Sequence, residues 1–178
     1  GCRVAFACDA CPLALETHKQ NHPEATHLCA QLPVPLPLPT DGRPFHLHGS
    51  PPCQQFSTVN TSGGTREKHA NASNLVEWYL DLALRSAATS WSMEQVASPI
   101  VLRYLETLKA AKAPQRNRFA YAVVNFYDYG VPQERRRVIA GSPDVVAHLL
   151  RAALAKQLAA TRARATRKLT QTAAERAE

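Results

Sequence analysis

Cys53 is the side chain in this sequence that is best placed for nucleophilic chemistry. Pro51 and Pro52 fix the backbone just before it, and a polar stretch follows it, so the thiol stands at the start of a loop. A positioned and partly exposed thiol that ionises is a strong nucleophile. A buried or incidental cysteine is the alternative interpretation.

Glu94 and two arginines form a second group of chemical candidates. Glu94 lies within the apolar stretch SWSMEQV, where an acid costs free energy unless it is paired or used. Such a glutamate can remain protonated or donate to the edge of a base, and the alternative is a solvated strand end. Arg135 and Arg137 alternate in QERRR, so on a strand both point to one face and suit a carbonyl-rich or anionic ligand. The alternative for the arginines is a solvated charged surface.

These side chains need a scaffold, which the order of the expected elements supplies. Apolar runs and expected strands lie at residues 3–8, 27–32, 45–49, 90–96, 119–126 and 137–140. Expected helices lie at residues 12–20, 71–88, 99–113 and from about residue 144 onward. A proline-rich linker and a polar loop with two glycines interrupt them, at residues 33–44 and 61–73. The alternation predicts an α/β fold with a mostly parallel central sheet flanked by helices.

Asp9 completes the set of candidates at one edge of this sheet. It ends the first expected strand, where nucleotide-binding α/β folds place an acid that accepts hydrogen bonds from ribose hydroxyls. A helix N-cap before Pro12 is the alternative. Cys53 and Glu94 also stand just after or at the end of expected strands, and ligands of such sheets bind beyond the carboxyl ends of the strands. We therefore expect all three side chains along the same edge.

A competing pattern of metal ligands occupies the amino-terminal region. Cysteines and histidines there are spaced like the ligands of zinc sites. They are Cys8 and Cys11, His18 and His22, and His27 with Cys29. The gap between the second cysteine and the first histidine is shorter than the usual zinc-finger spacer, so zinc is the less favoured hypothesis.

Composition limits the class of protein. The 178 residues suit one domain, and the five cysteines, an odd number without a secretory pattern, predict a reduced intracellular setting. No apolar run approaches the roughly 18 residues of a membrane span, so we expect a soluble protein. The net charge of the chain is +7. Much of it lies at residues 151–178, which contain seven basic and two acidic side chains. This basic tail suits a polyanion such as nucleic acid, or it is a solvated helix face.

Taken in order, several segments resemble those of the cytosine-C5 DNA methyltransferase family, whose members use S-adenosylmethionine. The resemblance rests on GSPPCQQFS at 49–57, MEQV at 93–96 and NFYDYGVPQERRRVIAG at 125–141. Weaker likeness comes from FACDACPLALETHKQNHP at 6–23 and NL at 74–75. Together these segments cover most of residues 6–142 and imply a Rossmann-like methyltransferase fold.

The resemblance implies a role for each catalytic candidate. Cys53 would attack C6 of a cytosine flipped out of the duplex. Glu94 would hold N3 and the exocyclic amine, while Arg135 and Arg137 would hold O2 and support their loop. The activated C5 would then take the methyl group, and loss of the C5 proton and of Cys53 would restore the base.

The resemblance also implies the residues that bind the cofactor. Asp9 would bind the ribose hydroxyls of S-adenosylmethionine, and Pro52 and Leu75 would line its pocket. Gln31 stands where the family has an aspartate for the adenine amine, and Gln95 replaces the Asn of the usual Glu-Asn-Val. These two replacements are departures from the family pattern.

Two further departures concern whole segments of the family pattern. The Phe-x-Gly-x-Gly segment with the first strand is missing before Gly1, and no target-recognition region follows the arginine-rich strand. We therefore expect a partial or truncated member, with a catalytic core at 1–143 and a basic helical tail at 144–178. The loop at 58–73, with its two glycines as a hinge, is expected to close over the flipped base.

The sequence therefore predicts a DNA (cytosine-5)-methyltransferase that acts on DNA inside the cell, without a membrane partner and as a monomer by default. A tRNA cytosine-5 methyltransferase of the same family is one alternative, since its Ser-Pro-Pro-Cys-Gln resembles residues 50–54. A catalytically inactive relic that binds nucleic acid through its basic tail is the other.

Overall fold

Two units make up the chain, which the computed structural model describes at residues 3–52, 66–111 and 118–175. The first unit is Gly1–Leu38 and the second is Pro39–Glu178. The candidate nucleophile Cys53 lies outside the described residues, as do the two glycines of the expected hinge.

The first unit is a β-α-β arrangement. Strand β1 (Phe6–Asp9) and strand β2 (Thr26–Cys29) pair in parallel, with Asp9 opposite Cys29 in the register. Helix α1 (Pro12–Asn21) connects them and begins with proline, which has no N–H to leave unsatisfied in the first turn. The expected first strand and the helix that follows it are confirmed.

The second unit contains a four-stranded sheet with the order β3-β4-β6-β5. Its elements are β3 (His46–Gly49), α2 (Arg66–Arg85), β4 (Ser90–Val96), α3 (Pro99–Ala110), β5 (Ala120–Asn125), the 3-10 helix η2 (Phe126–Tyr129), β6 (Arg136–Gly141) and α4 (Pro143–Glu175). The predicted α/β class is confirmed. Helix α2 begins five residues before the expected start at Asn71, so part of the expected loop is helical.

The sheet is mixed rather than mostly parallel, which corrects the expectation. Strands β3 and β4 are parallel, whereas β6 is antiparallel to both β4 and β5. Only residues 126–135 connect β5 to β6, and a parallel pair needs a crossover of a dozen or more residues. The short connection therefore forces the chain to return in the opposite direction.

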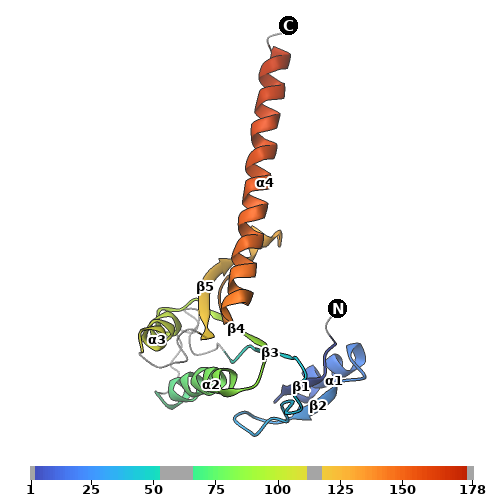
Figure 1. Ribbon diagram of the computed structural model, residues 1–178, viewed down its shortest axis with the longest axis vertical. Coiled ribbons are helices and arrows are strands. Elements are labelled where there is room, and N and C mark those ends of the chain that lie inside the picture. Colours follow the sequence, from blue (N-terminus) through green and yellow to red (C-terminus); the bar gives the residue numbers. More distant parts are fainter. Residues whose placement is uncertain (1–2, 53–65, 112–117, 176–178) are drawn as a thin grey trace. The chain divides into compact units, whose positions relative to one another are not determined.

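The core lies on the face of this sheet that α2 and α3 cover (Figure 1). Residues of β4 alternate between buried and half-buried, so Trp91 and Met93 point into the core. They pack with Leu80 of α2 and Leu105 of α3, all of which are at most 2% exposed. The other face of β4 is thereby left for Ser92 and Glu94.

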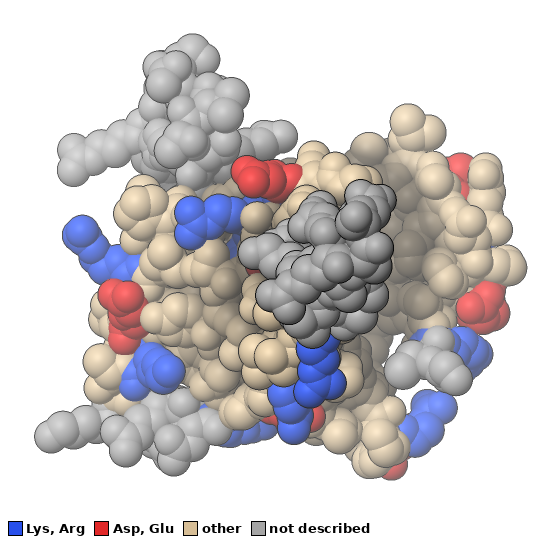
Figure 2. Space-filling model, turned by 90° about the horizontal axis from the view of Figure 1, so that it is seen from above, with Lys and Arg blue, Asp and Glu red and all other residues tan. Residues whose placement is uncertain are grey.

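Helix α4 packs on the sheet through its first turns and then extends beyond it (Figure 1). Val146 near its start is buried, and the Tyr129 hydroxyl donates to the Leu149 carbonyl at 3.1 Å. In the view along α4, Lys and Arg side chains are interspersed with Asp and Glu (Figure 2). Most basic side chains of the predicted basic tail lie beyond residue 163, outside the side chains that the structure describes. Within the described part of the chain, no helix is long and apolar enough to cross a membrane.

Candidate active site

Glu94 lies at the centre of a cluster of charged and polar side chains. Its Oε1 is 2.7 Å from Nε of Arg137 and 3.6 Å from Nη2 of Arg135. Its Oε2 accepts a hydrogen bond from the Ser50 hydroxyl at 2.7 Å. The Glu94 and Arg137 side chains are 22% and 20% exposed, so water screens this pair less than an ion pair on the open surface. Three residues predicted from the sequence as site residues are thus brought together.

The register of β4 and β6 explains why Arg137 reaches Glu94. Glu94 pairs with Ile139, and Arg137 stands two residues before that partner on the antiparallel strand. Side chains that are diagonal neighbours in this way share one face and lie within reach of long side chains. Arg135 lies two further residues back, at the end of the turn, and its side chain is 44% exposed.

Asn125 holds the turn that carries Arg135. Its side-chain oxygen accepts hydrogen bonds from the backbone N–H of Tyr127 at 3.3 Å and of Arg135 at 3.0 Å. One amide group therefore joins both ends of the turn between β5 and β6. Gly130 adopts a φ of 91° within this turn, a conformation that other residues rarely adopt. The sequence analysis did not assign a role to Asn125, although its place directly before a turn is a signal for such a side chain.

The segment that leads to Cys53 is tied to the same strand. Gln95, which is 1% exposed, donates from Nε2 to the Pro51 carbonyl at 3.0 Å. Its Oε1 accepts from the backbone N–H of Val96 at 2.7 Å, so both ends of this buried amide are satisfied. Gln95, at the position of the family asparagine, thus connects β4 to the proline segment.

The residues predicted to bind a cofactor fall in both units. Asp9, the last residue of β1, and Gln31, which follows β2, are both exposed at one edge of the two-stranded sheet. Pro52 is exposed and Leu75 is half-buried, both in the second unit. Each unit therefore carries two of the four predicted residues.

The chemistry of Asp9 suits a nucleoside. Its Oδ1 accepts from the backbone N–H of Cys11 at 2.7 Å, and no described residue donates to its other oxygen. A carboxylate oxygen accepts hydrogen bonds, and ribose hydroxyls donate them. Gln31 at the same edge has a side-chain carbonyl that could accept from an adenine amine. These two side chains fit the nucleoside part of S-adenosylmethionine.

The histidines of the first unit contact one another. Nδ1 of His18 is 2.9 Å from Nε2 of His27, and the ring centroid of His18 is 4.7 Å from that of His22. In the described part of the chain, no three His, Cys, Asp or Glu side chains form a group that could hold a metal ion.

The described cysteines are free thiols, and one of them is electrostatically unsuited to act as a nucleophile. They are Cys8, Cys11 and Cys29. Burial, with the nearby charge of Asp9, raises the pKa of Cys8 above its usual value, which keeps that thiol protonated. Cys8 is therefore a poor candidate for the nucleophile compared with Cys53.

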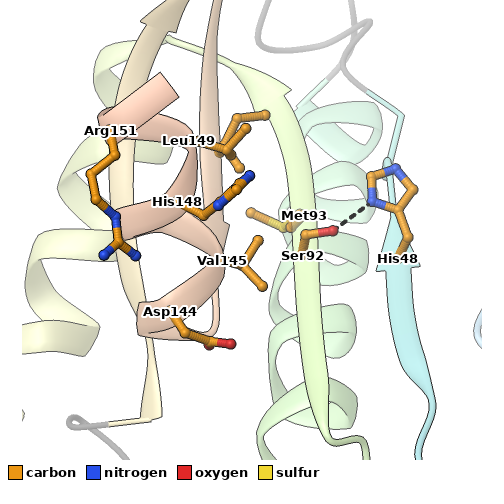
Figure 3. Close-up of a pocket in the computed structure, with 9 residues that line it drawn as sticks. His48, Ser92, Met93, Asp144, Val145, His148, Leu149 and Arg151 are labelled. Atoms are coloured by element: carbon orange, nitrogen blue, oxygen red, sulfur yellow. Dashed lines mark hydrogen bonds between the residues drawn. The ribbon is translucent and has the colours of Figure 1, made fainter. Parts of the chain in front are cut away.

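A cavity of about 610 Å³ opens between the start of α4 and strands β3, β4 and β6 (Figure 3). Val145 and Leu149 of α4 point toward β4, and Nδ1 of His48 is 2.9 Å from the Ser92 hydroxyl oxygen. Ser92 shares its strand face with Glu94, but the residues that line the cavity do not include Glu94 or either arginine. The cavity is therefore distinct from the charged cluster.

Residues 2–145 match the family model described as C-5 cytosine-specific DNA methylase. The chain is also similar in structure to a DNMT2 mutant from Spodoptera frugiperda, with 22% identity and a TM-score of 0.47. For the Entamoeba histolytica methyltransferase EhMeth the values are 16% and 0.46, and for the 23S rRNA methyltransferase ErmE they are 12% and 0.41.

These structures are much longer than the matched region. The match covers 79% of this chain and 42% of the DNMT2 chain, 78% and 43% for EhMeth, and 78% and 52% for ErmE. The chain thus spans about half or less of the length of each. No curated protein matches the sequence.

Proposed function

We propose that this chain, which belongs to the C-5 cytosine-specific DNA methylase family, carries the cytosine-binding half of a DNA (cytosine-5)-methyltransferase site. Members of this family have a Rossmann-like methyltransferase fold and use S-adenosylmethionine as the methyl donor. The side chains of this chain bind a cytosine flipped out of DNA and promote the transfer of a methyl group to its C5.

The cluster around Glu94 supports the proposal most strongly. A carboxyl group held at Oε1 by Arg137 and at Oε2 by Ser50 has a fixed plane before any substrate arrives. Groups that are already oriented stabilise charge in a transition state without reorganising. A cytosine presents N3, an amine and O2 along one edge, which calls for one carboxyl and one guanidinium side by side.

The chemistry proceeds from the Cys53 thiolate, which adds to C6 and so makes C5 nucleophilic. Glu94 accepts a hydrogen bond from the exocyclic amine and shares a proton with N3 as negative charge develops on the ring, and Arg135 and Arg137 bind O2. When bound, S-adenosylmethionine supplies the methyl group that C5 takes. Transfer of the C5 proton to a water molecule then allows the sulfur to leave C6 with the bonding electrons of the C–S bond, which restores the aromatic ring and the thiolate.

The cofactor in this proposal is bound at the edge where Asp9 and Gln31 stand. Asp9 accepts hydrogen bonds from the ribose hydroxyls, and Gln31 accepts from the adenine amine. Because DNA bases are stacked in the duplex, the target must first be flipped out, at a cost of about a few kcal/mol.

A covalent trap tests the proposal directly. DNA that contains 5-fluorocytosine should form a stable adduct with the full chain in the presence of S-adenosylmethionine, because fluorine at C5 cannot leave as the proton does. The adduct is detected by denaturing gel electrophoresis and by mass. Cys53→Ser should abolish it, and Cys29→Ser, at an exposed free thiol, should leave it intact.

Methyl transfer then distinguishes the substrates. Tritium from labelled S-adenosylmethionine should appear in DNA and not in tRNA. Transfer to tRNA alone would show that tRNA, rather than DNA, is the substrate. Binding of DNA without any methyl transfer or adduct would support the hypothesis of an inactive relic. An adduct that forms equally well with Cys53→Ser would contradict the assignment of the nucleophile.

A further inference from the structure

Ser50 holds the Glu94 carboxyl from the side opposite the arginines. Its hydroxyl donates to Oε2 at 2.7 Å, while Nε of Arg137 is 2.7 Å from Oε1. A carboxyl group fixed at one oxygen alone can still turn about the bond that joins it to the side chain. Two partners on different oxygens remove this freedom and define the plane of the group.

The parallel register of β3 and β4 brings Ser50 to this position. Gly49, the last residue of β3, pairs with Met93, so the next residue of each strand is Ser50 and Glu94. Gly49 is required here because the Tyr79 ring occupies the space that a side chain would need. The Tyr79 hydroxyl donates to the Leu47 and Ser92 carbonyls, so this side chain of α2 contacts both strands of the pair that brings Ser50 to Glu94.

A second contact ties Pro51, the residue after Ser50, to Gln95, the residue after Glu94 in β4. Gln95 points to the opposite face of β4 from Glu94 and donates to the Pro51 carbonyl at 3.0 Å. Residues 50 and 51 are therefore held by two consecutive residues of β4, one on each face of the sheet. Only Pro52 separates this anchored pair from Cys53 in the sequence.

From these contacts we propose that Ser50 is a positioning residue, which orients the Glu94 carboxyl and couples it to the segment that carries the nucleophile. The proposal rests on the proposed role of Glu94 in binding cytosine. A hydroxyl group suits this task because it can donate to an ionised carboxylate and accept from a protonated one. Ser50 can therefore keep its contact in either protonation state of Glu94.

The reaction itself provides the first test. Ser50→Ala should lower the rate constant for the 5-fluorocytosine adduct by about tenfold or more, the scale of a hydrogen bond to a charged group. The dissociation constant for the same oligonucleotide should stay within about twofold, because Ser50 acts on orientation rather than on binding. Ser50→Thr, which keeps the hydroxyl, should restore most of the rate.

Ser90→Ala is the matched control. Ser90 lies on the same face of β4 as Glu94, but its hydroxyl contacts Nδ1 of His46 at 2.8 Å. Its removal should leave the rate constant of adduct formation unchanged. An equal loss of rate in Ser50→Ala and Ser90→Ala, or an unchanged rate in Ser50→Ala, would overturn the positioning role.

A double-mutant cycle on stability provides a test that does not depend on activity. Ser50→Ala should lower the urea midpoint of the otherwise unchanged chain and should not lower it further in a Glu94→Ala background. Equal losses in both backgrounds would overturn the proposal. If the cycle shows coupling while the unchanged chain forms no adduct, the contact between Ser50 and Glu94 is supported and the proposed function is what fails.

Discussion

The carboxylates of Glu94 and Asp9 contrast in how the chain holds them. Glu94 is partly buried, and side chains from β6, from the turn before it and from the end of β3 contact both of its oxygens. Asp9 is exposed, and its side chain accepts from the backbone of Cys11, two residues away. The first arrangement depends on contacts between distant parts of the sequence, and the second on a local turn.

This contrast indicates how each group meets its proposed ligand. The Glu94 cluster is oriented in advance, so that a base would meet groups whose positions are already fixed. Asp9 offers an acceptor oxygen at the edge of a small sheet. Substitutions near Glu94 should therefore affect the chemical step, whereas substitutions at Asp9 should affect affinity for the cofactor.

The largest expected effect is that of Glu94→Ala. It removes the group that would bind N3 and leaves Arg137 without its partner at 2.7 Å. We expect the rate of adduct formation to fall by about 10²–10⁴-fold, the range for a catalytic acid or base. Affinity for S-adenosylmethionine, measured by calorimetry, should change little. Glu106→Ala on the exposed side of α3 is the control, and an adduct rate of Glu94→Ala within about twofold of this control would contradict the prediction.

Gly49→Ala should be the most damaging change to the scaffold of the Glu94 cluster. A Cβ atom there would lie 2.5 Å from Cδ2 and 2.6 Å from Cζ of Tyr79. The Tyr79 ring cannot withdraw easily, because it is buried and its hydroxyl donates to the Leu47 and Ser92 carbonyls. We expect a loss of about 1–3 kcal/mol in the free energy of unfolding, measured with urea. A loss below about 0.5 kcal/mol would show that the ring yields without cost.

The sequence predicted those parts of the site that depend on local periodicity. Strand β4 has the predicted bounds, and Arg135 and Arg137 both contact Glu94, although only Arg137 lies within strand β6. Side chains on a strand alternate with a period of two, so these inferences need no knowledge of distant residues.

The contact of Ser50 with Glu94 could not be predicted in the same way. It depends on the register between two strands that 40 residues separate in the sequence, from Gly49 to Ser90. The direction of β6 depends on the length of its connection to β5, because residues 126–135 are fewer than a parallel crossover needs. The roles of Cys53 and of the cofactor residues stay predictions.

A smaller effect should follow from Asp9→Asn. The asparagine keeps an oxygen for the backbone N–H of Cys11, so the turn should remain intact. It removes the negative charge, and a hydrogen bond that loses its charged acceptor weakens. We expect affinity for S-adenosylmethionine to fall by about tenfold in calorimetry, with an unchanged unfolding midpoint. Glu16→Gln, at an exposed position of the same unit, is the control. Equal affinities for Asp9→Asn and this control would remove Asp9 from the cofactor site.

The smallest expected effect concerns pH and the pairing of β3 with β4, which brings Ser50 to Glu94. Burial, and next the positive charge of His48, lower the pKa of His46 below its usual value of 6.5, while Asp144 opposes this shift. The unfolded chain then binds a proton at His46 more readily than the folded chain. This stabilisation is therefore complete above pH 6.5 and is lost as pH falls through the lowered pKa.

His46→Gln should reduce this pH dependence. The free energy of unfolding of the unchanged chain, measured with urea at about pH 7.5 and about pH 5.5, should fall toward acid more than that of His46→Gln. The glutamine can still contact the Ser90 and Ser92 hydroxyls, which lie 2.8 Å from the two ring nitrogens of His46. His148→Gln, at an exposed histidine of the same unit, should keep the full dependence. If all three proteins lose the same stability, protonation of His46 does not weaken the strand pair, and the Glu94 cluster is insensitive to pH by this route.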